Sequence, residues 1–525
     1  MAQSAIPGLA KPRAAAGGKW AVAIAVALGA LLEVVDTSIV NVALTDIQNT
    51  LGATLSEVAW VVSGYAVANV IILPMTAWLG DRFGKKKYFI FSLIGFTLAS
   101  IMCGMATTLP MLIVARVLQG LMGGGLLAKA QAILFETFPK EEQGVAQAFF
   151  GAIVIAGPAI GPTLGGYLVT NIGWRWIFFV NVPLGILAVF MCSAALPTDS
   201  ETKNTSQIDW IAIGLLATGL GSLQTLLEEG NSEDWFESRL ITTLFVASIV
   251  SLGAFVYREL KSPIPVVDLR VLRYRSLWAG SILSVIVGMA LYGALFAVPI
   301  FAQSLMGYTS QETGMLLLPS ALASAVTMIM AGQVIRKVDA RLGLVTGALI
   351  LVFAVHQLSN LTSGTGAEDF FWPLIIRSIG TVCMFLPLNL ATLGPIPKKD
   401  IAKASGFFNL TRQLGGSIGV ALLTLLLTQR QAFHRAVLVE KMANGDPAVL
   451  DRLQGFTGAF MAKGAVLFDA QRQALAALNG IVNRESLVMA FNDTFWATGV
   501  LILVFLPLVL LLGKVDKGVK VDAGH

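Results

Sequence analysis

The stretch Gly80-Asp81-Arg82-Phe83-Gly84-Lys85-Lys86-Lys87 separates an apolar run at 56–79 from another at 87–106. Each run is long enough to cross the roughly 30 Å hydrocarbon core of a bilayer as a helix. The link between the runs is short and carries four cations, which is typical of a loop on the cytoplasmic side of a membrane. This stretch therefore predicts a helical hairpin in an integral membrane protein.

The composition of the whole chain agrees with this prediction. Of its 525 residues, 56% are hydrophobic and 13% are charged, and the mean hydropathy is +0.76. Because soluble proteins contain about 25% charged residues, an ordinary soluble domain is excluded. Apolar runs of membrane-spanning length predict an all-α polytopic membrane protein with fourteen spans: 20–43, 56–79, 87–106, 109–135, 144–170, 176–196, 208–228, 239–257, 276–304, 312–335, 342–361, 371–395, 402–428 and 491–513.

The distribution of Lys and Arg predicts the orientation. An even number of spans places both termini on one side of the membrane. With the N-terminus in the cytoplasm, the cytoplasmic segments hold 23 Lys and Arg residues, whereas the short outer loops hold only Arg175 and Arg239. Since cytoplasmic loops are enriched in cations, we expect a multi-pass protein of the inner (plasma) membrane with both termini cytoplasmic.

One outer loop is far longer than the others. Residues 429–490 alternate apolar and charged side chains, which predicts two amphipathic helices broken near 444–447. Loops of this length are usually functional or disordered. We expect this one to be a docking surface for a periplasmic partner, and a lid over the outer face of the protein itself is the alternative.

A parallel repeat divides the chain into related halves. Residues 116–120 in the fourth span have a counterpart at 377–380 in the twelfth, and 80–86 has a degraded counterpart at 332–337. Two such halves with a site between them near the midplane are typical of transporters. The predicted units are a cytoplasmic tail (1–19), a six-helix bundle (20–196), two inserted spans with flanking loops (197–275), a second six-helix bundle (276–513, containing the loop 429–490) and a cytoplasmic C-terminal tail (514–525).

Six motifs follow one another along the spans, at 35–44, 80–87, 116–120, 157–166, 174–183 and 412–419. Together they resemble the fourteen-span drug:proton antiporter family of the major facilitator superfamily, over nearly the whole chain. The resemblance implies two six-helix bundles with two inserted spans. It also implies proton-coupled export of drugs, uncouplers or fatty acids, and a periplasmic membrane-fusion adaptor (EmrA-like) that would meet loop 429–490.

Two acids stand deep in the first span. Glu33 and Asp36 lie one helical turn apart on one face, and a charge at that depth costs at least about 2.5–3.5 kcal/mol. Both are therefore candidates for proton coupling and substrate binding, although a structural ion pair is the alternative. Arg116 lies at the level of Asp36, so we expect Asp36 to stay ionised and Glu33 to be easier to protonate. Gln119, from the same fourth-span motif, is a further substrate-binding candidate.

Two cations in the spans are candidates for binding anionic substrates. Lys129 lies in the fourth span and Arg412 in the thirteenth. For Lys129 the alternative is a side chain that snorkels to the headgroups. For Arg412 the alternatives are hydrogen bonds to backbone carbonyls and a contact with Glu33. Members of the family often carry an amide in place of Glu33 and an apolar residue in place of Lys129, so these charges bear on the substrate class.

Two groups of residues are candidates for gating. Gly157 and Gly161 recur every four residues and allow close helix packing, while Pro158 and Pro162 weaken the same helix. Static packing alone is the alternative. In the link after the second span, the gating candidates are Gly80, Asp81, Arg82 and Gly84. The cations of this link either hold the cytoplasmic ends of the spans together or only determine the orientation of the protein in the membrane.

Several classes of function find no support in the sequence. There is no Gly-x-x-x-x-Gly-Lys-Ser/Thr loop, no nucleophile–base constellation and no metal-ligand spacing of His or Cys. We expect no enzyme activity, no cofactor and no nucleic-acid partner, so the predicted partners are lipophilic small molecules, protons, membrane lipid and the adaptor. The rivals to a broad exporter are a dedicated exporter of a fatty acid, siderophore or amino acid, and a membrane receptor or scaffold that does not transport.

Overall fold

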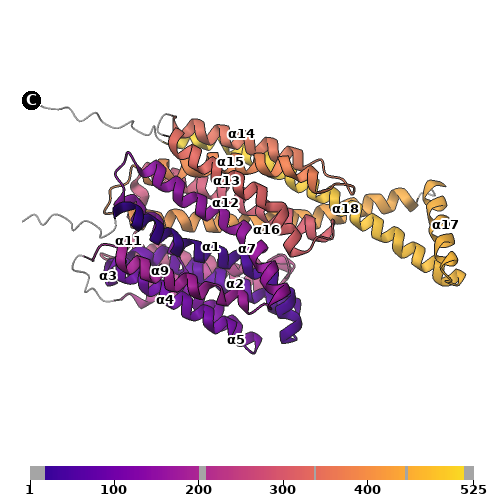
Figure 1. The fold of residues 1–525 in the computed structure, drawn as a ribbon, viewed down its shortest axis with the longest axis horizontal. Coiled ribbons are helices and arrows are strands. Elements are labelled where there is room, and N and C mark those ends of the chain that lie inside the picture. The colour runs from indigo at the N-terminus through magenta and orange to yellow at the C-terminus, as the bar shows by residue number, and fades with distance from the viewer. Residues whose placement is uncertain (1–17, 200–207, 336–337, 444–446, 513–525) are drawn as a thin grey trace, which may run out of the picture.

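The computed structural model describes residues 18–199, 208–335, 338–443 and 447–512, which form helices without any strand (Figure 1). The predicted tails and the expected break at 444–447 fall largely outside this part. The helices of the first half are α1 (Gly18–Leu51), α2 (Leu55–Ile72), α3 (Thr76–Phe83), α4 (Lys85–Gly104), α5 (Leu109–Gly123), α6 (Leu126–Thr137), α7 (Gln143–Asn171), α8 (Trp176–Phe179) and α9 (Asn181–Ala195).

The second half follows after two further helices. The inserted pair is α10 (Trp210–Glu229) and α11 (Arg239–Lys261). The remaining helices are α12 (Arg275–Ser304), α13 (Ser310–Val334), α14 (Ala340–Leu358), α15 (Ala367–Leu393), α16 (Ile401–Ala443), α17 (Pro447–Ala462) and α18 (Leu467–Phe505), with short 3₁₀ turns at Leu73–Met75, Trp235–Glu237, Leu269–Arg273 and Leu506–Leu511.

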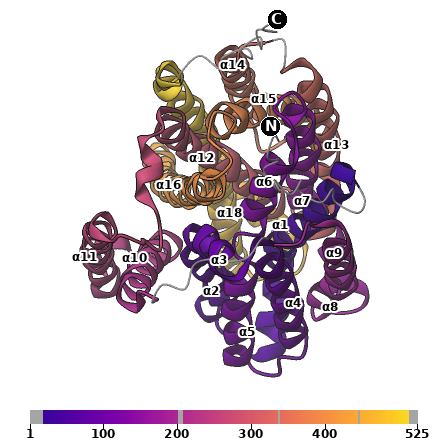
Figure 2. The ribbon, with the colours of Figure 1, turned by 90° about the vertical axis from the view of Figure 1, so that its left-hand side faces the viewer.

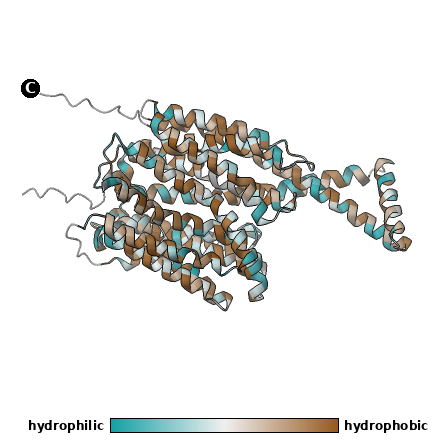
Figure 3. Cartoon of the chain, viewed as in Figure 1, coloured by the Kyte–Doolittle hydropathy of each residue, from teal (hydrophilic) through white to brown (hydrophobic). Residues whose placement is uncertain are grey.

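The predicted fold class is confirmed. Within the described residues, thirteen helical segments are long and apolar enough to cross a membrane, and α12 with its apolar stretch Arg275–Ala290 brings the set to fourteen. Hydrophobic residues run along most of the length of these helices (Figure 3). Many large apolar side chains face outward, among them Phe190 and Trp210, as expected where lipid and not water surrounds the protein.

The inserted helices stand beside the two bundles. α10 and α11 pair with each other, and α10 packs against α2 and α16 (Figure 2). α11 has few buried residues and exposes Phe245, Ile249 and Val250. This pair therefore occupies the periphery, where most of its surface meets lipid.

Two predicted spans are interrupted. The second span is broken at Leu73–Met75, where Pro74 lacks the amide that a continuous helix needs. The predicted fourth span 109–135 is confirmed as one apolar segment, Leu109–Thr137. It is divided into α5 and α6 at Gly124 and Gly125. Gly125 adopts a φ of 75°, which favours glycine.

The described part of the polar stretch 429–490 is largely helical. α16 continues to Ala443 and α18 begins at Leu467, so both helices run past the predicted ends of their spans. With α17 they form an extension that projects from one end of the bundles (Figure 1). The backbone amides and carbonyls of such an excursion are best satisfied inside helices, which explains why the spans do not stop at the apolar boundary.

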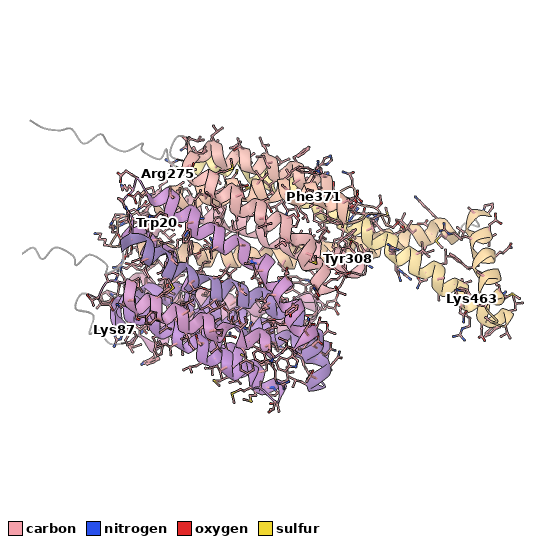
Figure 4. The ribbon with its side chains drawn as sticks, in the orientation of Figure 1. Trp20, Lys87, Arg275, Tyr308, Phe371 and Lys463 are labelled. Carbon is pink, nitrogen blue, oxygen red and sulfur yellow. The ribbon has the colours of Figure 1, made fainter. Side chains whose placement is uncertain are left out.

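The start of α1 and the start of α12 lie at the same end of the molecule, opposite the extension. Figure 4 shows Trp20, Lys87 and Arg275 at one end, and Lys463 at the far tip of the extension. The side chain of Arg275 donates from Nε to the Leu511 carbonyl over 3.0 Å, so the end of the second half lies there too. We call this end the terminal side; its assignment to the cytoplasm and the exact unit limits stay predictions.

Candidate functional site

Asp36 and Arg116 form a fully buried ion pair between α1 and α5. Arg116 donates from Nη1 to Asp36 Oδ2 over 2.6 Å, and the two side chains are 1% exposed or less. Arg116 also donates from Nε to the Val61 carbonyl, and its guanidinium lies 4.2 Å from the centre of the Tyr65 ring. Buried charges persist only when they are paired and hydrogen-bonded, and this arginine meets both conditions.

The second oxygen of Asp36 is held by two neutral amides. Gln119 donates from Nε2 over 2.9 Å and Asn181 from Nδ2 over 2.8 Å, both to Asp36 Oδ1. Gln119 also donates to Ser100 over 2.7 Å and accepts from Arg116 over 2.7 Å. The ion pair and the groups bonded to it therefore join four helices, α1, α2, α5 and α9.

Glu33 occupies a different environment one turn away. It is 7% exposed, and among the described residues it makes no ion pair. Its Oε1 accepts from Asn69 Nδ2 over 2.8 Å, and its Oε2 accepts from the backbone amide of Leu127 over 2.8 Å. Both donors are neutral, so this carboxylate can take up a proton without leaving a buried arginine unpaired.

Lys129 is buried against side chains of α4. Its Nζ donates to Ser92 Oγ over 2.7 Å and lies 4.1 Å from the centre of the Tyr88 ring, a cation–π contact. The side chain is 9% exposed and borders a cavity of about 30 Å³. Such a volume accommodates water but no drug-sized ligand.

Arg412 lies in the second half, on α16. It donates to Asn409 Oδ1, and its guanidinium lies 5.1 Å from the centre of the Phe385 ring. Asn409 in turn donates from Nδ2 to Gln131 Oε1 over 2.7 Å, which links this cation to α6 of the first half. Arg412 is 5% exposed. The structure thus connects Arg412 to the first half through amides.

The glycines of α7 pack on the part of α1 that carries the two acids. A Cβ on Gly157 would lie 2.6 Å from Val34 Cγ1, and one on Gly161 would lie 1.9 Å from Ser38 Oγ. Any larger residue would push α7 away from α1. Pro158 and Pro162 lie within the same helix.

Comparison with known proteins identifies the family. The model of the Major Facilitator Superfamily matches residues 26–420. This chain belongs to the major facilitator superfamily. Within it, the chain is 34% identical over 93% of its length to the "Multidrug export protein EmrB" of Escherichia coli (strain K12), covering 94% of that protein. It is 30% identical over 93% of its length to the "Fatty acid resistance protein FarB" of Neisseria gonorrhoeae, covering 95%.

Solved structures of the superfamily share the fold. A double-tryptophan mutant of XylE superposes with a TM-score of 0.59 at 11% identity, over 95% of this chain and 96% of that one. The human organic anion transporter MFSD10 (TETRAN) superposes with a TM-score of 0.54 at 12% identity, over 92% of this chain and 99% of that one. At these identities the likeness concerns the major facilitator fold alone.

The link 80–87, typical of the superfamily, is fastened to the rest of the first half. A Cβ on Gly84, whose φ is 94°, would lie 2.3 Å from Asp199 Oδ2. Asp199 accepts from the backbone amide of Lys86 over 2.8 Å and so caps the start of α4. Gly80 is buried, Asp81 is exposed, and Arg82 stacks 5.7 Å from the Trp78 ring.

Sequence reasoning missed several members of this major facilitator site. Asn69 and the Leu127 amide bind Glu33, while Asn181 and Ser100 complete the surroundings of Asp36. Of these, only Asn181 lies in a recognised motif, 174–183, and its position there was the available signal. Among the described residues, no group of three or more His, Cys, Asp or Glu is placed to hold a metal ion.

Proposed function

We propose that this protein is a proton-coupled exporter of hydrophobic or amphipathic small molecules, such as drugs, uncouplers or fatty acids, that works by alternating access. Membership of the superfamily supports transport. The similarity to the multidrug export protein EmrB and to the fatty acid resistance protein FarB supports export of drugs and fatty acids. Inner-membrane location with cytoplasmic termini follows from the distribution of Lys and Arg.

The observation that carries this proposal is the contrast between the two acids of α1. Asp36 is bound to Arg116 and two amides, whereas Glu33 is bound by neutral donors alone. Loss of the Asp36 charge would leave the buried Arg116 unpaired, whereas the neutral donors of Glu33 allow this carboxyl group to bind and release a proton. We assign the exchanged proton to Glu33 and a structural and electrostatic role to Asp36.

The buried cations bias the substrate class toward amphipathic anions. Lys129 and Arg412 are buried cations that each lie against an aromatic ring. Glu33, Asp36 and Gln119 are buried in the first half and are the further candidates for contacts with the substrate. An acid with an apolar body, such as a fatty acid or a weakly acidic uncoupler, matches the two buried cations better than a quaternary cation.

The gating role of the glycine-rich segments rests on their packing. Gly157 and Gly161 hold α7 against α1, and Pro158 and Pro162 allow α7 to bend. At the terminal side, Lys85 bonds Glu136 over 2.6 Å and ties α4 to α6. We propose that the link, through Gly80, Asp81, Arg82 and Gly84, positions this ion pair while the two halves rock against each other.

The helical extension is the candidate partner site, and we assign it to a periplasmic membrane-fusion adaptor of the EmrA type. Among the residues of α17 none is buried, and Leu450, Met461, Leu467 and Phe468 are exposed apolar side chains nearby. A hollow of about 250 Å³ lies between the helices of the extension, bordered by Val449, Leu478 and Ile481 among others. Exposed apolar surface of this kind is typical of a protein interface.

Proton release on ligand binding tests the proposed function. Purified protein in a weakly buffered solution with a pH dye should release protons when a long-chain fatty acid or an acidic uncoupler is added, and release fewer with a quaternary cation. Binding of the exported molecule and of the proton compete in an antiporter, which is the reason for the release. Ligand binding without any proton release would contradict the coupling. A preference for lipophilic cations would contradict the substrate class.

Removal of the extension tests the adaptor site. Replacing residues 436–484 with a short Gly/Ser bridge keeps the base of the extension, where Arg430 and His434 bind Asp493. We expect loss of co-purification with a co-expressed EmrA-type adaptor and unchanged proton-driven transport in membrane vesicles. A lid predicts the reverse, altered transport with retained adaptor binding. Unchanged adaptor binding would show that docking occurs elsewhere.

A further inference from the structure

The helix α6 begins in the middle of the first half without a cap of its own. The four amides at the start of a helix lack partners within the helix and are usually bonded by the side chain of the preceding residue. Here that residue is Gly125, which has no side chain. The carboxylate of Glu33, on α1, bonds the amide of Leu127 instead. Glu33 therefore supplies the missing cap from another helix, where a negative charge is favoured.

The interruption before α6 is built into the packing. A Cβ on Gly124 would lie 2.0 Å from Ile72 Cγ2, and Gly125 needs its positive φ to redirect the chain. Only glycine fits at these positions. The break makes α6 a short helix separate from α5.

The same short helix holds the second half at the terminal side. Gln131 lies one turn after Leu127 and therefore on the same face of α6. It donates from Nε2 to Asn389 Oδ1 over 2.7 Å and accepts from Asn409 Nδ2 over 2.7 Å. Ser405 Oγ donates to the carbonyl of Ala128 over 2.9 Å. All of these side chains are buried. α6 thus bonds Glu33 at its start and α15 and α16 along its length.

We propose that α6 couples protonation of Glu33 to opening of the terminal side, by moving the Gln131 contacts with Asn389 and Asn409. Ionised Glu33 fixes the start of α6 and keeps the amide contacts closed. A proton on Glu33 removes the negative charge from the helix start, weakens the bond to Leu127 and frees α6 to move. This inference rests on the proposed proton-coupled transport and adds the element that transmits the signal.

The charges around Glu33 are consistent with this direction. On α6, Lys129 attracts the ionised carboxylate, and on α2 the nearest titratable group is Tyr65. Asp36 on α1 is already paired with Arg116. The neighbouring helices α7 and α9 contain no Asp, Glu, Lys or Arg. Lys129 therefore stabilises the closed, ionised state, and protonation of Glu33 removes this attraction as well.

Spin-label distances across the terminal side test the coupling. Cysteines at Lys140 and Lys399, both exposed and on opposite halves, report opening in a background with Cys383→Ala. In the wild-type background, the population with the open distance should rise about fivefold or more relative to the population with the closed distance as the pH falls. A change of this size is at the lower end of typical allosteric coupling. Gln131→Leu should favour the open distance at every pH and lose most of the pH response. Asn409→Leu removes the same contact from the other half and should behave alike.

Matched controls separate this inference from the proposed function. Gln143→Leu removes a buried amide whose hydrogen bonds, to the carbonyls of Phe135 and Phe138, stay within the first half, and it should respond to pH like the wild type. A wild-type protein whose distances ignore pH would overturn the proposed proton coupling, and the inference with it. A wild type that responds, together with a Gln131→Leu variant that responds equally, would overturn the role of α6 alone.

Discussion

Glu33→Gln is expected to abolish proton-driven export while leaving the protein folded. Glutamine has nearly the shape of glutamate and still presents an oxygen to Asn69 or to the Leu127 amide, but it carries no exchangeable proton. Each positive charge that crosses the membrane contributes about 2.3 kcal/mol per 100 mV. The loss of one proton per cycle therefore lowers the highest accumulation ratio about fiftyfold at 100 mV. Substrate uptake into inverted vesicles, measured with and without an imposed gradient, gives this ratio.

A carboxylate elsewhere on α1 provides the control. Asp46 lies on the same helix but is exposed near its far end, so Asp46→Asn should retain the wild-type ratio. Glu33→Gln should still bind substrate, because the amide keeps the shape and the hydrogen-bonding capacity of the carboxyl group. Wild-type pH dependence of uptake in Glu33→Gln would remove Glu33 from the coupling mechanism.

The pairing of Asp36 with Arg116 shows how far the sequence can predict the site. Counting residues into two antiparallel spans places both side chains at one depth, and a buried charge needs a partner, so their proximity follows from simple geometry. The bond from the Leu127 amide to Glu33 does not follow in this way. It depends on a helix start inside the fourth span, which the continuous apolar run 109–135 conceals, because glycines at 123–125 read equally well as packing residues.

The extension shows a second limit of hydropathy. The end of an apolar run marks where a chain leaves the hydrocarbon, and it does not mark where the helix ends. α16 passes this boundary with Arg435 on its surface, and the bond from Arg435 Nε to Asn483 Oδ1 over 2.8 Å holds it against α18. Such cross-helix contacts join residues some fifty positions apart and leave no local signal in the sequence.

Arg116→Ala is expected to destabilise the fold more than any other single substitution in the site. The change leaves the Asp36 carboxylate buried with only Gln119 and Asn181 as donors, and it empties the space against Tyr65. Breaking a buried ion pair by removal of one partner typically costs about 3–5 kcal/mol, because an uncompensated charge remains. The loss should appear as a lower midpoint of thermal unfolding in detergent and a lower yield of monodisperse protein.

A double substitution distinguishes this charge effect from a loss of packing. Asp36→Asn alone leaves Arg116 without its anion and should also destabilise the protein, whereas Asp36→Asn with Arg116→Gln replaces the pair by neutral amides that can bond each other. Because paired buried groups interact strongly, the double variant should lose less stability than the sum of the losses of Asp36→Asn and Arg116→Gln alone, by about 0.5–3 kcal/mol. Additive losses would mean that Asp36 and Arg116 contribute independently and that the ion pair does not organise the four helices. Since the double variant keeps Glu33 and its two donors, it should also retain proton-driven export, which would place the exchanged proton on Glu33 and not on Asp36.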